Sequence, residues 1–339
     1  MSDTIAVIQV GLGALGRRLT PFLLERSYLR VVGAVDTDPA IIGSDLGEVC
    51  GIGRPLGVVV SGDARAACVP GASSCPTAVA VHTTVSSIAV AEEQIEALLH
   101  HGLDVVSSCE ELSFPWQSAP EISADIDRHA KAAGKAVLAT GVNPGFLMDY
   151  LPLVLTGICR EVRKITVLRC QDARSRRLSF QQKIGAGLTL EQFARKKADG
   201  SLRHVGLTES MQMIASRLGW KLERTEDRIE PVIAGQEQAS SEQAMPAGLV
   251  AGVYQLGLGY VAGEEKIRLE FRASIGEPEV QDTIIVDGEP PLRFTLPGGV
   301  NGDIATCAIL TNAIRTVVEA PPGLWTMADL PPTTWSAGL

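Results

Sequence analysis

The chain has 339 residues, more than one hydrophobic core usually serves, so we expect two domains. Hydrophobic residues make up 45% and charged residues 20%, a balance that excludes a disordered or fibrous protein. The formal net charge of −9 argues against a nucleic-acid or anionic-membrane surface, and no apolar stretch of about eighteen residues predicts a membrane span. We therefore expect small-molecule partners, no nucleic acid, no membrane and a cytoplasmic protein.

The first apolar run, Ile5 to Val10, leads directly into the glycine-rich loop GLGALG. Gly11 permits a tight turn, Gly13 lets the backbone approach a ligand, and Gly16 lets helix and strand pack closely. A pyrophosphate there would meet unsatisfied N–H groups at a helix start. We therefore predict a dinucleotide-binding loop for NAD or NADP, formed by Gly11, Leu12, Gly13, Ala14, Leu15 and Gly16.

The second apolar run, Leu29 to Val35, ends at Asp36, twenty residues after Gly16. A carboxylate at this spacing accepts hydrogen bonds from the adenosine ribose and would repel a 2′-phosphate, so Asp36 favours NAD. Arg17 could pair with such a phosphate, which keeps NADP open, although an exposed helix face is the alternative interpretation. The competing interpretation of the whole segment is an ordinary glycine turn followed by a solvated aspartate.

Further apolar runs follow, and helical stretches separate most of them. The runs are Gly57 to Val60, Thr77 to His82, Leu103 to Ser108 and Lys135 to Thr140, and the helices are Ala89 to His101 and Ser118 to Ala133. Strands that alternate with helices predict a parallel, doubly wound Rossmann sheet in an α/β fold.

From about residue 162 the pattern changes to long strands with polar alternation, which predicts a mainly antiparallel second sheet. These strands are Val162 to Cys170, Glu264 to Ile275 and Gln281 to Gly288, and the helices expected near them are Thr189 to Ala198, Thr208 to Leu218 and Gly302 to Glu319. We therefore expect a dinucleotide-binding domain over 1–143, a second domain over 144–300, and a C-terminal helix and tail over 301–339 that pack back on the first.

Polar residues follow three strands of the predicted parallel sheet, at the edge where ligands of such sheets gather. His82, Thr83 and Thr84 follow the fourth strand, and Asn143 follows the sixth. We expect these four residues to contact the nicotinamide end of the cofactor. His82 could instead pack in the core or bond to the backbone.

Glu110 and Glu111 follow the fifth strand and are candidates for a general acid or base. Because successive side chains of an extended segment point opposite ways, we expect only one of them to face a pocket. Helix capping or a solvated pair is the alternative. The neighbouring Cys109 has no adjacent histidine to activate it, so we interpret it as a packing residue.

The seven cysteines are odd in number, scattered and never spaced as Cys-x-x-Cys. This pattern indicates reduced thiols and no metal site. In the second domain His204 lies just before an expected helix start and could point at a pocket. Arg169, Arg174, Arg176 and Arg177 could bind a substrate carboxylate, although exposed arginines are common in sheets.

Seven segments give the chain a resemblance to the native amine dehydrogenases and 2,4-diaminopentanoate dehydrogenase, within the dihydrodipicolinate-reductase-like superfamily. The segments are VGLGALGRRL from Val10, DLGEVCG from Asp45, SSCEELSFPW from Ser107, GVNPGF from Gly141, RRLSFQQKIGAGLT from Arg176, RHVGLTES from Arg203 and NGDIATCAILTNAI from Asn301. The His-His-x-x-Lys signature of dihydrodipicolinate reductase itself is missing from the second domain. This departure disfavours lysine biosynthesis.

The resemblance implies reversible oxidative deamination, in which an amine, NAD(P)⁺ and water give a carbonyl compound, ammonia and NAD(P)H. It also implies that the second domain is an inserted α+β domain for substrate binding and homodimer formation. In the family a glutamate at this strand end orients ammonia and assists formation and collapse of the carbinolamine and iminium. The position corresponds to Glu110 or Glu111, of which we prefer Glu110.

Residues that match the family's substrate pocket, or lie beside it, are Phe146, Leu147, Arg169, Gln171, His204 and Thr306. A diamino-acid oxidoreductase of the 2,4-diaminopentanoate dehydrogenase type is the first alternative, because its charged substrate needs a carboxylate-binding cation. A non-catalytic NAD(P)-binding sensor is an alternative of another class. A hydroxy-acid or homoserine-type dehydrogenase is the third, and it would need a lysine such as Lys183 or a histidine at the hydride centre.

Overall fold

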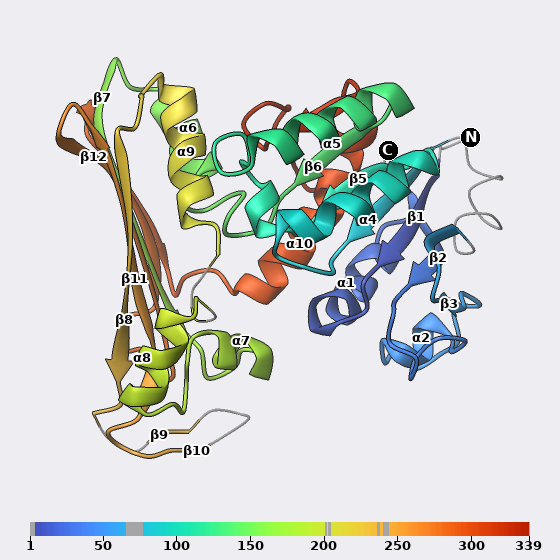
Figure 1. The fold of residues 1–339 in the computed structure, drawn as a ribbon, viewed down its shortest axis with the longest axis horizontal. Coiled ribbons are helices and arrows are strands. Elements are labelled where there is room, and N and C mark those ends of the chain that lie inside the picture. Colours follow the sequence, from blue (N-terminus) through green and yellow to red (C-terminus); the bar gives the residue numbers. More distant parts are fainter. Residues whose placement is uncertain are drawn as a thin grey trace. The chain divides into compact units, whose positions relative to one another are not determined.

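The computed structural model describes residues 4–65, 77–200, 202, 205–235, 238–239 and 244–338. The chain divides into two compact units. Unit 1 comprises residues 1–145 and 303–339, and unit 2 comprises residues 146–302. Unit 1 is therefore built from both ends of the sequence, and unit 2 is one continuous insertion (Figure 1).

Unit 1 contains a seven-stranded sheet in the order β15-β6-β5-β4-β1-β2-β3, in which every neighbouring pair is parallel. The strands are β1 (Ile5–Val10), β2 (Leu29–Val35), β3 (Val60–Ser61), β4 (Ala78–His82), β5 (Asp104–Ser107), β6 (Ala136–Ala139) and β15 (Gly323–Trp325). The central strands are buried throughout, as parallel strands are when helices cover both faces of a sheet. The predicted Rossmann-type sheet is confirmed.

The helices of unit 1 include the two that were expected between the later strands. They are α1 (Ala14–Leu24), α2 (Leu46–Val49), α4 (Ile88–His100), the 3₁₀ turn η1 (Glu110–Leu112), α5 (Pro120–Ala133) and α10 (Gly302–Val318). On α4 the buried residues Ala91, Ile95 and Leu98 recur at helical spacing and pack with Ile126 and Ala130 of α5. The two helices therefore share one apolar core with β1, β4, β5 and β6.

The C-terminal segment adds the short strand β15 beside β6 at the edge of this sheet. The Asp127 carboxylate of α5 accepts the backbone N–H of Leu324 at 3.0 Å, and Lys135 O accepts the N–H of Gly323 at 2.9 Å. These bonds fix β15 between α5 and β6. No helix within the described ranges is long and apolar enough to cross a bilayer.

Unit 2 contains a six-stranded sheet in the order β14-β13-β7-β12-β11-β8. The strands are β7 (Glu161–Asp172), β8 (Arg224–Ile233), β11 (Val250–Val261), β12 (Glu264–Ser274), β13 (Gln281–Glu289) and β14 (Leu292–Pro297), and a separate pair joins β9 (Gln238–Ala239) to β10 (Ala244–Met245). All neighbours in the large sheet are antiparallel except β7 and β12. The prediction of a mainly antiparallel sheet is confirmed.

The helices in the described part of unit 2 are α6 (Tyr150–Thr156), α7 (Leu178–Lys183), α8 (Leu190–Ala198) and α9 (Leu207–Leu218). Alternate residues of β7, from Ile165 and Val167 onward, are buried in one core with Met211 and Ile214 of α9. Helix α8 begins as expected, because Thr189 forms a capping box with Gln192.

Candidate active site

The glycine loop of unit 1 joins β1 to α1, and two of its glycines are required by the protein itself. Gly11 has a φ of +91°, and a Cβ there would lie 2.8 Å from the backbone of Thr83. A Cβ on Gly16 would lie 1.9 Å from the carbonyl oxygen of Gly11. No side chain fits at either position without displacing backbone, so these glycines set the shape of the loop.

Gly13 is different, because no protein contact requires it to be a glycine. Its φ is −66°, its residue surface is exposed, and a Cβ there would meet no atom within 4 Å. It is the N-cap of α1, whose first N–H groups have no side-chain cap. The missing side chain therefore leaves open space at a positive helix end, which fits the pyrophosphate of NAD or NADP.

We expect Gly13→Ala and Gly16→Ala to separate these two functions. Gly13→Ala should weaken NADH binding about tenfold, the equivalent of roughly 1.4 kcal/mol, while the melting temperature stays unchanged. Gly16→Ala should lower stability by about 1–3 kcal/mol, because its Cβ overpacks the loop. Fluorescence titration with NADH and thermal unfolding measure both effects. Normal NADH binding by the Gly13 variant would contradict the assignment of the phosphate position.

Asp36 stands at the carboxyl end of β2, and its side chain reaches the glycine loop. One carboxylate oxygen accepts the Leu12 N–H at 2.5 Å, and the other accepts the Asp38 N–H at 2.9 Å. Arg17 also turns back on the loop, where its Nε donates to Leu12 O at 2.8 Å. Asp36 and Arg17 are thus both fixed at the loop, while Ala14 and Leu15 form the first turn of α1.

Residues at the end of β4 hold the glycine loop in place by hydrogen bonds. The Thr83 hydroxyl donates to Gly11 O at 2.8 Å, and the Thr83 N–H donates to Val10 O at 2.7 Å. His82 is fully buried, with Nδ1 2.9 Å from the Ser107 hydroxyl and Nε2 2.7 Å from both Gln94 Oε1 and the Thr84 hydroxyl. Protein groups therefore contact both nitrogens of the imidazole. Gln94 was not singled out from the sequence.

Burial lowers the pKa of His82, and the contact with Gln94 only partly opposes this shift. An unfolded histidine has a pKa of about 6.5, so protonation below that pH favours the unfolded chain. The stabilising contribution of neutral His82 is complete above the unfolded pKa and is lost as the pH falls toward the lower folded pKa.

We therefore expect the wild-type protein to lose more stability between pH 7.5 and 5.5 than His82→Gln loses. Glutamine cannot be protonated in this range, so the variant removes the contribution of the imidazole from the pH dependence. Urea unfolding of both proteins at several pH values measures the difference. Parallel pH dependences would contradict a buried, neutral His82.

The segment after β5 departs from the expected extended conformation. Glu110–Leu112 form the 3₁₀ turn η1, so the expectation that alternating side chains point opposite ways is wrong for this segment. The Glu111 carboxylate accepts the Ile88 N–H at the start of α4, at 3.0 Å. Ser87, the N-cap of α4, makes no side-chain cap, so Glu111 provides the negative group at that helix end. The alternative of helix capping thus applies to one member of the glutamate pair.

Cys109 is the N-cap of η1, and its environment fits a packing residue. Its side chain is buried, and Sγ lies 3.1 Å from Ser86 O. Burial raises the pKa of this thiol to about 12, so the thiolate is not formed near neutral pH. Among the described residues, no group of three or more His, Cys, Asp or Glu side chains is placed to hold a metal.

Asn143 lies in the segment after β6, before the cis peptide bond to Pro144. The Thr306 hydroxyl of α10 accepts the Val142 N–H in the same segment at 3.3 Å. Thr306 therefore fixes the backbone beside Asn143. This contact gives the residue a structural function that the sequence did not indicate.

In unit 2 a buried polar cluster lies at the end of β7. The Arg169 side chain is 2% exposed, and its Nη2 donates to Val300 O at 3.2 Å. Gln171 Nε2 donates to the same carbonyl at 2.6 Å, and Gln171 Oε1 accepts from Arg176 Nη1 at 2.8 Å. Arg169 Nε and Nη1 have no hydrogen-bond partner among the described residues, and Asp282 Oδ1 lies 3.6 Å from Nε.

Desolvation dominates the electrostatics of this pair. Burial lowers the pKa of Arg169 to about 10, although Asp282 opposes the shift. Burial also raises the pKa of Asp282, against the attraction of Arg169. A buried pair at 3.6 Å without a direct hydrogen bond compensates its desolvation poorly. The hydrogen-bonding capacity of the Arg169 guanidinium is therefore not fully used by the described residues.

The other residues of unit 2 that were predicted to bind substrate lie outside this polar cluster. Phe146 is half-buried and packs against Tyr150 of α6, and Leu147 is buried. Arg174 is exposed and pairs with Asp172, with Nε 2.6 Å from Oδ2, and half-buried Arg177 is the N-cap of α7. His204 lies outside the described residues.

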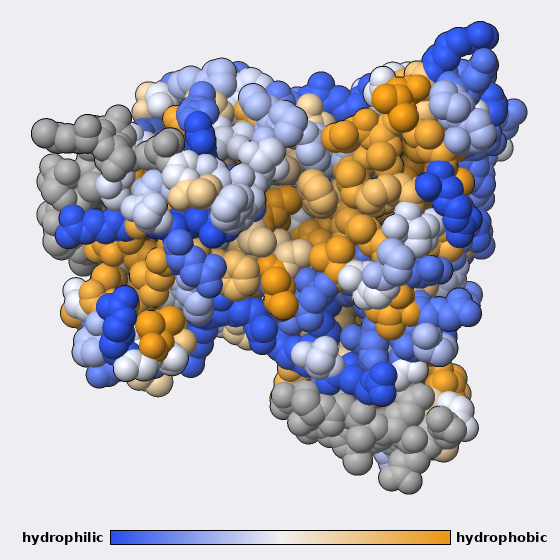
Figure 2. All heavy atoms as spheres, turned by 180° about the vertical axis from the view of Figure 1, so that it is seen from behind, coloured by the Kyte–Doolittle hydropathy of each residue, from blue (hydrophilic) through white to orange (hydrophobic). Residues whose placement is uncertain are grey.

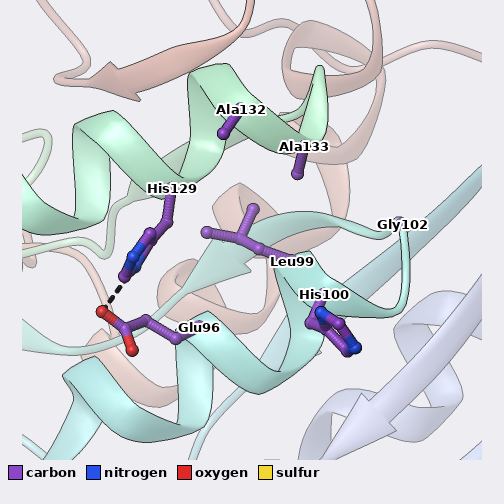
Figure 3. A pocket seen from close by; sticks show the side chains of 7 residues that line it. All are labelled: Glu96, Leu99, His100, Gly102, His129, Ala132 and Ala133. Atoms are coloured by element: carbon purple, nitrogen blue, oxygen red, sulfur yellow. Dashed lines mark ion pairs between the residues drawn. The ribbon is translucent and has the colours of Figure 1, made fainter.

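A pocket of about 490 Å³ lies between the C-terminal ends of α4 and α5 (Figure 3). His129 and Glu96 meet across it, with Nδ1 2.5 Å from Oε1, and Leu99, Ala132 and Ala133 also line it. The strands β5 and β6 begin just after these helix ends. The pocket is therefore at the amino ends of the strands, away from the edge where ligands of parallel sheets bind.

The parallel sheet, the glycine loop and Asp36 define a dehydrogenase of the Rossmann type that uses a nicotinamide cofactor. A model of the family described as 2,4-diaminopentanoate dehydrogenase C-terminal domain matches residues 146–337. The 2,4-diaminopentanoate dehydrogenase of Acetoanaerobium sticklandii is 34% identical over 97% of this chain and 94% of its own length. The chain belongs to the 2,4-diaminopentanoate dehydrogenase family.

Two further similarities concern amine dehydrogenases. The amine dehydrogenase of Streptomyces virginiae is 24% identical over 96% of both chains. The structure of amine dehydrogenase from Mycobacterium smegmatis matches with a TM-score of 0.86 at 24% identity, covering 100% of this chain and 99% of the other. The predicted family and fold class are confirmed, and the chain is an NAD(P)-dependent oxidoreductase.

Proposed function

We propose that the chain interconverts a small amine and its carbonyl compound, with Glu110 as the residue that handles the proton and ammonia. The supporting observation is the geometry of η1, which follows β5 at the carboxyl edge of the sheet. There the Glu111 carboxylate caps α4. The resemblance implies that one glutamate at this strand end handles ammonia, and we assign this function to Glu110. Cofactor contacts are assigned to the glycine loop, Asp36, Arg17, Thr83, Thr84 and Asn143. His82, expected among them from the sequence, is left out because it is fully buried and both its ring nitrogens contact protein groups.

The bound nicotinamide supplies the hydride acceptor or donor, and the protein's own groups do the rest. In the direction of amine formation, the Glu110 carboxylate accepts a proton from ammonium, so that neutral ammonia can attack the carbonyl carbon. A proton then passes from the added nitrogen to the alkoxide oxygen, which gives the carbinolamine. The same group, now protonated, donates to the leaving hydroxyl as water departs. Its carboxylate then stabilises the cationic iminium until hydride reaches the carbon.

The direct test is oxidation of NADH and NADPH with a panel of small ketones, aldehydes and keto acids, with and without high ammonium at mildly alkaline pH. We expect the oxidation of NADH or NADPH to depend on ammonium. Comparison of the two rates gives the cofactor preference, which Asp36 is expected to set in favour of NADH. Oxidation without ammonium would indicate carbonyl reduction. Cofactor binding without any turnover would support the sensor alternative.

We also propose that the substrate carries a carboxylate, as in a diamino acid. The buried Arg169 supports this proposal, because within the described part of the chain two of its nitrogens have no hydrogen-bond partner and the Asp282 carboxylate oxygen is 3.6 Å away. A substrate carboxylate would supply the acceptors that a buried guanidinium requires. The 34% identical relative is named for 2,4-diaminopentanoate, an amine of this kind.

Comparison of matched substrates tests the carboxylate proposal. We expect kcat/KM for 2,4-diaminopentanoate to exceed that for the corresponding amide at least about tenfold, since a charge-assisted hydrogen bond contributes roughly 1.5–3 kcal/mol. Equal kcat/KM values for the acid and the amide would favour simple amines. NADH formation at saturating NAD provides the measurement.

We propose finally that the chain forms a homodimer through unit 2. Val154 on α6 and Ile158, two residues after the end of that helix, are 52% and 70% exposed. Figure 2 shows apolar side chains gathered around this part of unit 2. An interface between two copies would bury them.

We expect Ile158→Asp to convert the dimer to a monomer, because the change places a charge in an apolar interface. Light scattering after size exclusion measures the mass. Val59→Asp is the matched control, since Val59 is 62% exposed on unit 1. A monomeric wild-type protein, or a dimer that tolerates both changes, would contradict the proposal.

A further inference from the structure

The turn η1 is fastened on one side to the start of α4. Glu111 contributes both its N–H, which donates to Ser86 O at 3.3 Å, and its carboxylate, which accepts the Ile88 N–H at 3.0 Å. The Cys109 thiol lies 3.1 Å from the same Ser86 carbonyl. These contacts join the turn that carries Glu110 to the segment at the start of α4.

On the other side the turn is held through Ser107, the last residue of β5. The Ser107 hydroxyl oxygen accepts the N–H of Cys109, the N-cap of the turn, at 3.1 Å. The hydroxyl proton can then be donated to His82 Nδ1, which lies 2.9 Å away. This arrangement requires Nδ1 to be an acceptor, so the imidazole proton resides on Nε2.

The other nitrogen of His82 fits this tautomer. Nε2–H can donate to Gln94 Oε1 at 2.7 Å, and the Thr84 hydroxyl donates to the same oxygen at 2.6 Å. Each donor in the chain from Cys109 N–H to Gln94 Oε1 then has one acceptor. A protonated imidazole would have no acceptor site for the Ser107 proton, and burial disfavours that form.

We propose that Ser107, His82 and Gln94 are positioning residues, which fix the backbone of η1 and thereby the approach of Glu110 to the reacting nitrogen. The inference rests on the proposed function of Glu110. Its physical basis is that reacting groups must be held within about 0.5 Å of the productive geometry, and supporting hydrogen bonds maintain this precision. Gln94 acts from α4, so one helix supports the turn at two places.

The test compares Ser107→Ala with Ser107→Thr. Ser107→Ala removes the hydroxyl between Cys109 and His82, and we expect kcat to fall roughly 10–100-fold, as for outer-shell changes elsewhere. The NADH dissociation constant should stay within about twofold. Ser107→Thr keeps an oxygen at this position and should recover most of kcat.

Ser123→Ala is the matched control, because Ser123 is equally buried in unit 1 and donates to Ala119 O at 2.6 Å within α5. Wild-type kcat in both alanine variants would overturn the inference, and a Glu110→Gln variant assayed beside them separates this failure from failure of the proposed function. If Ser107→Ala does not fold, the variant Gln94→Met tests the inference instead. It should lower kcat about threefold or more at unchanged NADH binding, and wild-type kcat would overturn the inference.

Discussion

Glu110→Gln is expected to lower ammonium-dependent turnover about a thousandfold, the middle of the range for loss of a general acid or base. Glutamine keeps the size and hydrogen-bonding ability of the side chain, but it cannot accept the proton of ammonium or stabilise a cationic iminium by its charge. NADH binding should remain normal, because the cofactor contacts are assigned to other residues. Steady-state kinetics and fluorescence titration give the two readouts.

Glu111→Gln is the matched control one residue away. The change weakens the charged cap on α4, so we expect a loss of about 1 kcal/mol in stability and turnover within severalfold of wild type. If turnover is lost only in Glu111→Gln, catalysis would have to be assigned to Glu111 instead of Glu110. Wild-type turnover in both variants would exclude the pair from catalysis.

The second large effect is expected at Arg169 of unit 2. Arg169→Met leaves Asp282 buried without its cation, and removal of one member of a buried pair typically destabilises by about 3–5 kcal/mol. The double variant Arg169→Met, Asp282→Asn removes both charges and should recover most of that stability. Urea unfolding of the two single variants and the double variant measures the coupling.

The double variant also tests substrate recognition without the stability defect. We expect the ratio of kcat/KM for the carboxylate-bearing amine to kcat/KM for the matching amide to fall at least about tenfold. The fall should come from a lower kcat/KM for the acid, with that for the amide unchanged. Arg174→Met is the control, because Arg174 is exposed and pairs with Asp172 at the surface. An unchanged preference in the double variant would remove Arg169 from substrate recognition.

The cofactor end of unit 1 was predictable because its signals are local. The run Ile5–Val10, the three glycines and Asp36 occur within 32 residues, and each residue type is required by backbone conformation or charge at its own position. The contact between Asp36 and Leu12 follows from the βαβ geometry that the spacing predicts. Assignment of nucleotide contacts to these residues stays a prediction.

The support around Glu110 was not predictable in the same way, because it depends on contacts between distant segments. Glu111 caps α4 from 23 positions away, and no local pattern shows that Ser87 leaves that helix uncapped. Gln94 carried a usable signal that was missed, since it interrupts the apolar stripe of Ala91, Ile95 and Leu98. Arg169 was a candidate from the sequence, and its burial has a signal too, because it has the same parity as the core residues Ile165 and Val167 on β7.

The place of β15 has a consequence for the order in which the protein is assembled during synthesis. Residues 146–302 leave the ribosome before Gly323–Trp325, so the six-stranded sheet can close while the seven-stranded sheet still lacks its edge beside β6. The exposed edge of β6 is then an unpaired strand that could join another chain. Nascent chains halted before β15 are therefore expected to be more prone to aggregation than chains that contain it.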